Sequence, residues 1–211
     1  MYRKHLKRFI DVTASGISLI LLSPIFLIVI VLIKIDSKGP ALFTQKRVGK
    51  EGKEFKIFKF RTMLTFEDSF YPDGSPIENY DRTTKVGNIL RKTSIDELPQ
   101  LINIFIGDMS IVGPRPTLSY QVEKYDDNQA RRLKVKPGLT GLAQINGRNS
   151  LSWEQKIQYD IDYVENITFL SDLKIILKTF VVVFKSEKID FIAHDEISKH
   201  ARDVREDVNN S

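Results

Sequence analysis

An uncharged apolar run near the N-terminus is the feature that most constrains how this 211-residue chain can fold. The run, Ile17 to Ile33, contains no charged residue. As a helix it would be about 25 Å long, which is short for a membrane core of roughly 30 Å. Ser23-Pro24 lies near its middle, and a proline there kinks a helix. Lysine and arginine flank the run on both sides, as expected when both ends stay in the cytoplasm. The sequence therefore predicts a bent, re-entrant membrane helix over residues 1–36, with a straight membrane span as the alternative.

The composition limits the chemistry that the chain can carry out. Its net charge is +5 at pH 7, which favours an anionic partner such as nucleic acid, acidic lipid or a phosphorylated substrate. It contains no cysteine, which excludes disulfides, thiolate catalysis and cysteine-ligated zinc. The three histidines, His5, His194 and His200, lie in or near the tails. We therefore do not expect a histidine metal site or a histidine-based catalytic triad.

The segments after the apolar run predict an α/β arrangement, in which membrane-associated helices surround a small hairpin. Short runs at 41–45 and 53–61 alternate apolar and polar residues and are separated by glycines, a pattern typical of a β-hairpin. Polar residues with prolines and a glycine at 65–84 indicate a mobile loop. Residues 86–91 indicate a short helix or turn.

The second half of the chain reads mainly as helices. Residues 118–133 predict a charged, solvated helix, and the acidic residues around Asp160 read as another solvated helix face. Residues 172–188 mix apolar residues with lysines, which indicates a helix on an anionic bilayer or a buried helix whose lysines reach solvent. We expect one domain at the membrane interface over 37–188 and a polar tail over 189–211.

Two adjacent carboxylates, Asp96 and Glu97, stand out between basic residues. Arg91 precedes them and Arg115 follows in a Gly-Pro-Arg-Pro turn. One carboxylate able to attack, a second able to move a proton and cations to hold an anion would suit phosphoryl chemistry. The alternative is structural, because Ser94 and Glu97 also fit a helix capping box.

Pro99 and the prolines around Arg115 constrain how these groups are presented. Proline is tolerated in a helix only near its start, which places Asp96 and Glu97 in the first turn. There the helix dipole is expected to keep Asp96 ionised at neutral pH. The two prolines limit the backbone of Arg115, so its guanidinium could be presented with little entropy loss. An ordinary surface ion pair is the alternative for Arg115.

Many motifs, in this order, resemble the bacterial sugar transferase family, and in particular its small, PglC-like monotopic phosphoglycosyl transferases. The resemblance covers roughly residues 1–187. The motifs are Lys7-Arg8-Phe9-Ile10-Asp11, Ser23-Pro24, Phe43-Thr44-Gln45-Lys46-Arg47-Val48-Gly49, Phe58-Lys59-Phe60-Arg61-Thr62-Met63, Ser94-Ile95-Asp96-Glu97-Leu98-Pro99-Gln100, Gly107-Asp108-Met109-Ser110, Gly113-Pro114-Arg115-Pro116, Lys136-Pro137-Gly138-Leu139-Thr140-Gly141, Tyr159-Asp160 and Leu170-Ser171-Asp172-Leu173-Lys174.

The resemblance implies a two-step, ping-pong reaction that uses Mg²⁺. Asp96 would attack the β-phosphate of a UDP-sugar, release UMP and carry the phosphosugar covalently. Undecaprenyl phosphate would then accept the phosphosugar. Glu97 would act as a base for, or help to position, this acceptor, and Asp96 would also ligate Mg²⁺.

The resemblance also assigns roles to residues outside the carboxylate pair. The residues expected to bind substrate or phosphate are Gln45, Arg47, Lys59, Arg61, Arg91, Arg115 and Arg148. Those expected to have structural or membrane roles are Lys7, Arg8, Asp11, Ser23 and Pro24. Asp160 and Asp172 are expected to support the site.

The expected partners are a UDP-sugar, undecaprenyl phosphate and the phospholipid bilayer, without nucleic acid, and a homodimer is compatible with the sequence. The expected location is the cytoplasmic face of the bacterial inner membrane, with a monotopic attachment. The leading sugar is N,N′-diacetylbacillosamine, with GlcNAc, GalNAc or galactose as alternatives. Two other functions remain open: a membrane-bound basic adaptor that binds acidic lipid or nucleic acid without catalysis, and a hydrolase that uses the same carboxylates on a nucleotide diphosphate.

Overall fold

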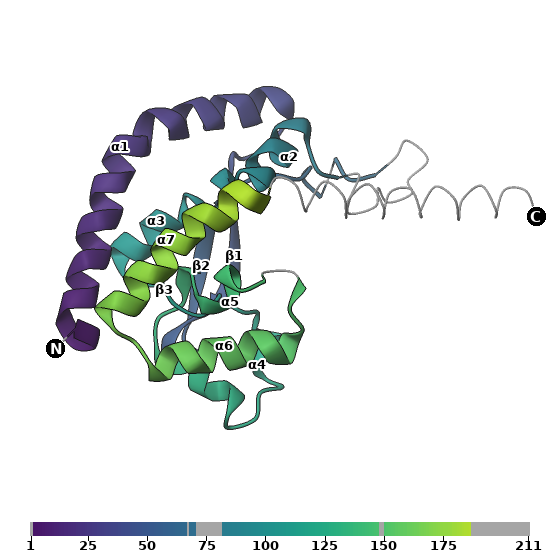
Figure 1. Cartoon of the computed structure of the whole chain (residues 1–211). Helices are drawn as coiled ribbons and strands as arrows, with labels where there is room; N and C mark the ends of the chain where they lie inside the picture. Colours follow the sequence, from purple (N-terminus) through teal and green to yellow (C-terminus); the bar gives the residue numbers. More distant parts are fainter. Residues whose placement is uncertain (1, 67, 71–81, 148–149, 187–211) are drawn as a thin grey trace, which may run out of the picture.

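The computed structural model describes residues 2–66, 68–70, 82–147 and 150–186, and its longest element is a bent N-terminal helix (Figure 1). Arg148, the tail at 189–211 and most of the predicted loop at 65–84 lie outside the described residues. The elements, in chain order, are η1 (Tyr2–Leu6), α1 (Lys7–Asp36), β1 (Leu42–Val48), η2 (Lys50–Gly52), β2 (Glu54–Phe60), α2 (Lys85–Lys92), η3 (Ile95–Glu97), α3 (Gln100–Ile106), β3 (Ser110–Val112), α4 (Ser119–Val122), η4 (Gln129–Lys134), β4 (Gly138–Thr140), α5 (Leu142–Ile145), α6 (Trp153–Glu165) and α7 (Phe169–Ser186).

Helix α1 contains the whole apolar run and continues through Pro24. Figure 1 shows it rising along one side of the molecule and then bending across the top, as expected of a helix with an internal proline. Many of its apolar side chains are exposed, including Phe9 at 68%, Ile20 at 74% and Leu21 at 71%. Among the described helices, it alone is long and apolar enough to cross a membrane. These features indicate membrane association, whereas the re-entrant course stays a prediction.

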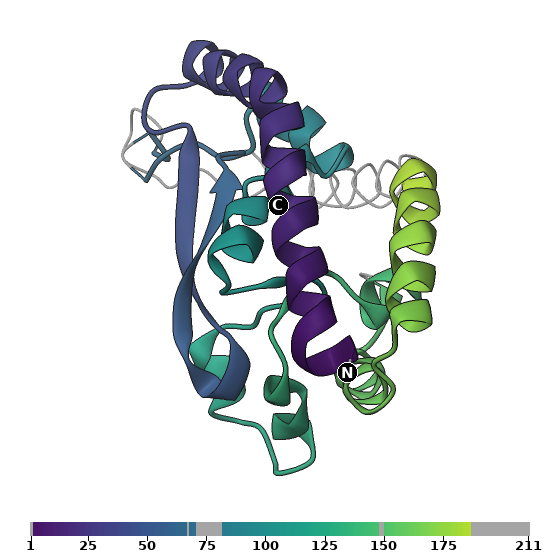
Figure 2. The ribbon, with the colours of Figure 1, turned by 90° about the vertical axis from the view of Figure 1, so that its left-hand side faces the viewer.

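The predicted hairpin is confirmed. Its first strand runs on to Val48, beyond the expected end at residue 45. Its second strand, Glu54–Phe60, is one residue shorter at each end than expected. Strands β1 and β2 pair antiparallel, from Leu42 opposite Phe60 to Val48 opposite Glu54. Figure 2 shows this hairpin on one side of α1 and α7 on the other. The predicted helix at 86–91 is also confirmed, as α2.

Helix α3 lies between α1 and the hairpin and is fixed to both by polar contacts. The buried Asn103 side chain accepts a hydrogen bond from the Phe58 backbone N–H at 3.0 Å and donates to the Lys56 carbonyl at 2.8 Å. On the other side, the Arg8 guanidinium donates to two carbonyls at the C-terminal end of α3, at 2.5 and 2.8 Å. A cation suits the negative end of the helix dipole there. These contacts hold the segment that follows η3 in place.

Buried polar contacts tie the start of α1 to the C-terminal half of the chain. The Asp172 carboxylate on α7 accepts hydrogen bonds from Lys7 Nζ at 2.5 Å and from the Tyr163 hydroxyl at 2.8 Å. Asp11 accepts a hydrogen bond from the Ser110 hydroxyl, in β3, at 2.8 Å. Because both carboxylates are almost completely buried, removing a partner would leave a buried charge unmatched.

A second, parallel sheet joins β3 to β4. A Cβ atom at Gly138 would lie 2.1 Å from the Gly113 backbone nitrogen, so the two segments approach closely only because residue 138 is glycine. Val112, Tyr163 and Ile175 form a buried cluster that packs β3 against α6 and α7. In α7, Leu177 is exposed, so this helix presents one buried and one exposed apolar face.

The prediction of a continuous solvated helix over 118–133 is wrong. The structure breaks this segment into α4, a turn and η4. Arg132, at its end, is buried and paired with Asp160 on α6. The default prediction of a solvated face for Asp160 is wrong for the same reason, since this tertiary contact overrides local propensity.

Candidate active site

The adjacent carboxylates lie in η3, a 3₁₀ turn between α2 and α3, one turn earlier than the sequence predicts. Ser94, just before the turn, has a φ of 56°, which is uncommon for a residue with a Cβ. Its side chain makes no capping hydrogen bond to the turn. The capping-box alternative is therefore wrong, because the Glu97 carboxylate is instead bonded to two cations.

Glu97 joins two distant parts of the chain. Its Oε1 atom accepts a hydrogen bond from Lys59 Nζ, in β2, at 2.6 Å and from Arg115 Nη2 at 2.8 Å. Burial alone would raise the pKa of Glu97, but the positive charges of Arg115 and Lys59 outweigh it and lower the pKa to about 2. Glu97 is therefore a permanently ionised anchor for two cations at neutral pH.

Asp96 has a different environment, although it is the next residue. No described residue donates a hydrogen bond to its carboxylate, which lines a large cleft. Burial, followed by the charge of Glu97, raises the pKa of Asp96 to about 6, against the opposing effect of nearby cations. The helix dipole alone predicts a stabilised anion, but burial has the larger effect on the pKa of Asp96. With a pKa near 6, Asp96 is still mostly ionised at pH 7 and can attack an electrophile.

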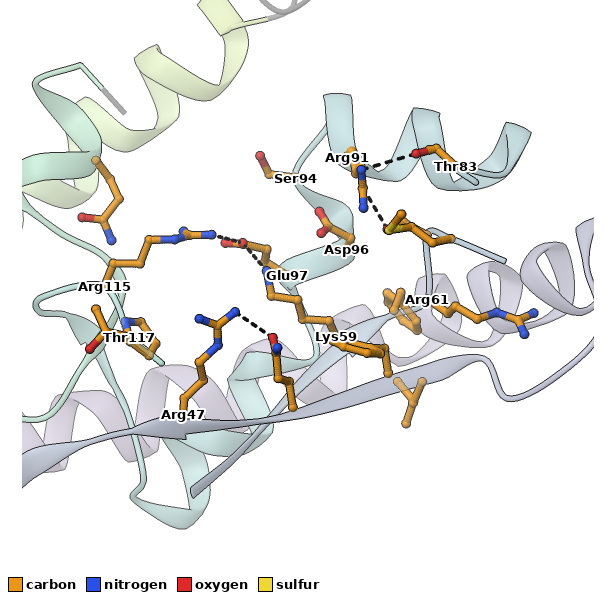
Figure 3. Close-up of a pocket in the computed structure, with 18 of the residues that line it drawn as sticks. Arg47, Lys59, Arg61, Thr83, Arg91, Ser94, Asp96, Glu97, Arg115 and Thr117 are labelled. Atoms are coloured by element: carbon orange, nitrogen blue, oxygen red, sulfur yellow. Dashed lines mark hydrogen bonds and ion pairs between the residues drawn. The ribbon is translucent and has the colours of Figure 1, made fainter. Parts of the chain in front are cut away.

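The cleft has a volume of about 1110 Å³, and Figure 3 shows cations converging on the carboxylates from several elements. The predicted substrate-binding residues that line it are Gln45, Arg47, Lys59, Arg61, Arg91 and Arg115. Side-chain contacts orient two of these cations. Arg91 Nε donates to the Thr62 hydroxyl at 2.9 Å, and Arg47 Nη2 donates to Gln45 Oε1 at 2.7 Å. The cleft can therefore hold a strongly anionic group next to Asp96.

The structure does not bring the Arg61 guanidinium to the carboxylates. Arg61 is buried, and it donates to the Ser37 carbonyl at 2.8 Å, to the Ser37 hydroxyl at 2.9 Å and to the Lys38 carbonyl. Figure 3 shows the guanidinium directed away from Asp96 and Glu97. The Arg61 guanidinium therefore links the residues that follow α1 to the end of the hairpin. Arg148, another predicted phosphate ligand, lies outside the described residues.

Arg115 is positioned by Arg132, a residue that the sequence did not single out. Arg132 Nη2 donates to the Arg115 backbone carbonyl at 3.0 Å and also bonds to the Asp160 carboxylate. The Arg132 guanidinium also lies 5.9 Å from the centre of the Trp153 ring. No local signal separates Arg132 from the other charged residues of its segment, because its role depends on contacts with α6.

The donor groups of the cleft fit a divalent cation only if the substrate completes the coordination. Among the described residues there is no cluster of three or more acidic or histidine side chains that could hold a metal. Magnesium commonly binds to one or two carboxylates together with substrate phosphates. Of the three described carboxylates that line the cleft, Glu97 and Asp160 are paired with cations. Asp96 is therefore the residue that fits this role.

Comparisons with known proteins place the chain in a family. A family model for bacterial sugar transferases matches residues 2–186. The chain is 47% identical over 189 residues to an uncharacterized sugar transferase, EpsL, of Bacillus subtilis (strain 168), a match that covers 90% of this chain and 92% of the relative. It is 44% identical over 182 residues to a UDP-glucose:undecaprenyl-phosphate glucose-1-phosphate transferase of Caulobacter vibrioides, covering 82% and 67% of the two chains. It is 38% identical over 198 residues to an undecaprenyl-phosphate galactose phosphotransferase of Salmonella typhimurium, covering 87% and 41%.

These relatives are transferases, and the match extends over nearly the whole described chain. The non-enzymatic adaptor is therefore not retained, since it also gave the two carboxylates no purpose. The chain is an enzyme of the transferase class, and it belongs to the family of bacterial sugar transferases.

Proposed function

We propose that this enzyme transfers a sugar 1-phosphate from a UDP-sugar to undecaprenyl phosphate through a covalent intermediate on Asp96. The observation that carries the proposal is the contrast between the two neighbouring carboxylates. Glu97 is held by Lys59 and Arg115, whereas Asp96 faces the cleft without a hydrogen bond from any described residue. An ionised carboxylate with cations nearby, and with no hydrogen bond from the described part of the chain, suits nucleophilic attack on a phosphate ester.

In the first step, an Asp96 carboxylate oxygen attacks the β-phosphorus of the UDP-sugar. A bond forms between this oxygen and phosphorus, the bond to the bridging oxygen of UMP breaks, and UMP leaves with the electron pair. In the second step, a phosphate oxygen of undecaprenyl phosphate attacks the same phosphorus. The bond to Asp96 then breaks, which restores the carboxylate and gives undecaprenyl diphosphate sugar.

Glu97 and its cations position the phosphates in this scheme. A carboxylate whose pKa is lowered to about 2 is a weak base at neutral pH. Glu97 therefore serves mainly to hold Lys59 and Arg115 at fixed places beside the reacting phosphorus. These cations offset the repulsion between Asp96 and an anionic diphosphate.

We further propose that the reaction needs a magnesium ion, which Asp96 would help to hold. Bound magnesium would supply charge neutralisation at the diphosphate. Removal of divalent cations with EDTA is expected to stop UMP release, and added Mg²⁺ is expected to restore it. UMP release is measured with UDP-sugar alone, in a single turnover. Full UMP release by enzyme freed of metal would contradict the role of magnesium.

We propose that α1, whose apolar side chains are largely exposed, attaches the chain to the cytoplasmic face of the inner membrane without crossing it. If α1 is re-entrant, both of its ends remain on that face. Because the chain contains no cysteine, single cysteines at Arg3 and Lys38 can report on the two ends. A membrane-impermeant maleimide is expected to label both in inverted vesicles and neither in intact spheroplasts. Labelling of the two positions from opposite faces would contradict the re-entrant model and favour a straight span.

A screen of radiolabelled UDP-sugars with undecaprenyl phosphate tests the activity and identifies the sugar. N,N′-Diacetylbacillosamine is our leading choice, with GlcNAc, GalNAc and galactose behind it. The names of two of the relatives specify glucose and galactose, so the screen includes UDP-glucose. We expect lipid-linked product and UMP in equal amounts. Repeated turnover without the lipid acceptor would indicate a hydrolase instead.

A further inference from the structure

One wall of the cleft carries polar groups that the proposed mechanism does not use. This wall comes from η4, α5 and α6. The residues that form it are Arg132, Ala143, Gln144, Trp153, Lys156 and Asp160. We call these six residues the α5–α6 wall.

Gln144 is the most unusual residue of this wall. Its Oε1 and Nε2 atoms are both shielded from solvent, and neither has a hydrogen-bond partner among the described residues. The amide fits here because residue 141 is glycine, since a Cβ atom at Gly141 would lie 2.8 Å from Oε1. Buried polar atoms are nearly always hydrogen-bonded in folded proteins. A cleft-lining amide with both atoms unbonded is therefore a candidate for binding a ligand.

The α5–α6 wall adjoins the carboxylates through Arg115. The Arg115 side chain bonds to Glu97, and its backbone carbonyl accepts a hydrogen bond from Arg132 at 3.0 Å. Trp153 is 36% exposed and lines the cleft, so part of its surface is open to a ligand. A donor whose β-phosphate lies at Asp96 could therefore extend along this wall.

The chemistry of Gln144 and Trp153 matches a flat heterocycle with alternating donors and acceptors. Uracil presents an N–H donor between two carbonyl acceptors. A glutamine amide presents one donor beside one acceptor, so it can pair with either side of that N–H. An aromatic side chain adds a surface on which a base can stack. Sugar hydroxyls, by contrast, project in several directions and do not require a planar partner.

We propose that Gln144 binds the uracil edge of the nucleotide donor, with Trp153 as the neighbouring aromatic surface. This inference rests on the proposed function, because that function supplies the UDP-sugar. It assigns the α5–α6 wall to the nucleoside and leaves the opposite side of Asp96 for other parts of the two substrates.

Binding of UMP tests the assignment without lipid or sugar. Isothermal titration calorimetry of the full chain in detergent is carried out on wild type and on Gln144→Leu, which roughly keeps the size of the side chain and removes the donor and the acceptor of the amide. We expect the dissociation constant of UMP to rise about ten-fold or more, as for loss of a paired amide contact to a base. Gln158→Leu is the matched control, because Gln158 is exposed on α6 and bonds only to Asp162 among the described residues. It should bind UMP like wild type.

The other outcomes separate this inference from the proposed function. Unchanged UMP binding by Gln144→Leu would overturn the assignment. This holds even if the KM of the UDP-sugar changes, because Gln144 would then contact the sugar and not the uracil. If Gln144→Leu fails to fold, Gln144→Glu is used in its place. A folded Gln144→Glu variant that binds UMP as tightly as wild type would also overturn the assignment. If Gln144→Leu weakens UMP binding but the wild-type enzyme makes no lipid-linked product, the uracil site would be supported and the transfer reaction contradicted.

Discussion

Replacement of Asp96 by asparagine is expected to abolish formation of the lipid-linked product. The amide keeps the size of the side chain but is not a nucleophile, so no covalent intermediate can form. We expect the transfer rate to fall by at least about 10³-fold, as for loss of other enzymatic nucleophiles. Asp96→Ala should have the same effect, whereas Asp127→Asn should not, because Asp127 is exposed and lies outside the cleft.

Mass spectrometry of the intact protein provides the direct test of the intermediate. Wild type with UDP-sugar alone should gain the mass of one sugar phosphate, and Asp96→Asn should not. Product formation at the normal rate by Asp96→Asn would contradict the mechanism. So would a wild-type enzyme that forms product but never shows the adduct under the same conditions.

Replacement of Arg132 by methionine is expected to give the largest loss of stability. Arg132 and Asp160 form an ion pair in which the two side chains are only 4% and 2% exposed. Removing the cation leaves a buried carboxylate without its partner, which typically costs about 3–5 kcal/mol in the free energy of unfolding. Burial already raises the pKa of Asp160 to about 6. The loss should therefore shrink as the pH falls and Asp160 takes up a proton.

The neighbouring Arg131 offers a matched control for this change. It forms an ion pair with Glu165, which like Asp160 lies on α6, but both side chains are substantially exposed. Arg131→Met should cost less than about 1 kcal/mol. Thermal unfolding in detergent measures both variants. The double change Arg132→Met with Asp160→Leu should recover much of the lost stability, because it removes both buried charges. An equal, small loss from Arg131→Met and Arg132→Met would contradict this account of the pair.

Features that depend on neighbours in the sequence were predictable. The apolar run gave α1, and the alternation of apolar residues gave the hairpin, because each pattern reflects the residues of one element. The adjacent Asp96 and Glu97 could be singled out because basic residues surround them. The cations that contact Glu97 were named as candidates from their motifs, but the sequence did not show that both bond to the same oxygen.

Features that depend on contacts between distant segments were not predictable. Arg61 and Lys59 lie two residues apart in the chain, yet only Lys59 reaches the carboxylates, while Arg61 bonds to the end of α1. Likewise, nothing local distinguishes the buried Arg132 from the less buried residues around it.

The sequence by itself determined a basic chain with an apolar N-terminal helix, a hairpin and a carboxylate pair, because composition and periodicity are local properties. The transferase family was indicated by the resemblance of the ordered motifs. Only the tertiary structure decided that Asp96 and Glu97 differ. The two side chains are adjacent in the chain, but one is bonded to cations from two other segments and the other faces the cleft. Burial and charge at a side chain depend on what packs around it, and the order of residues does not fix that.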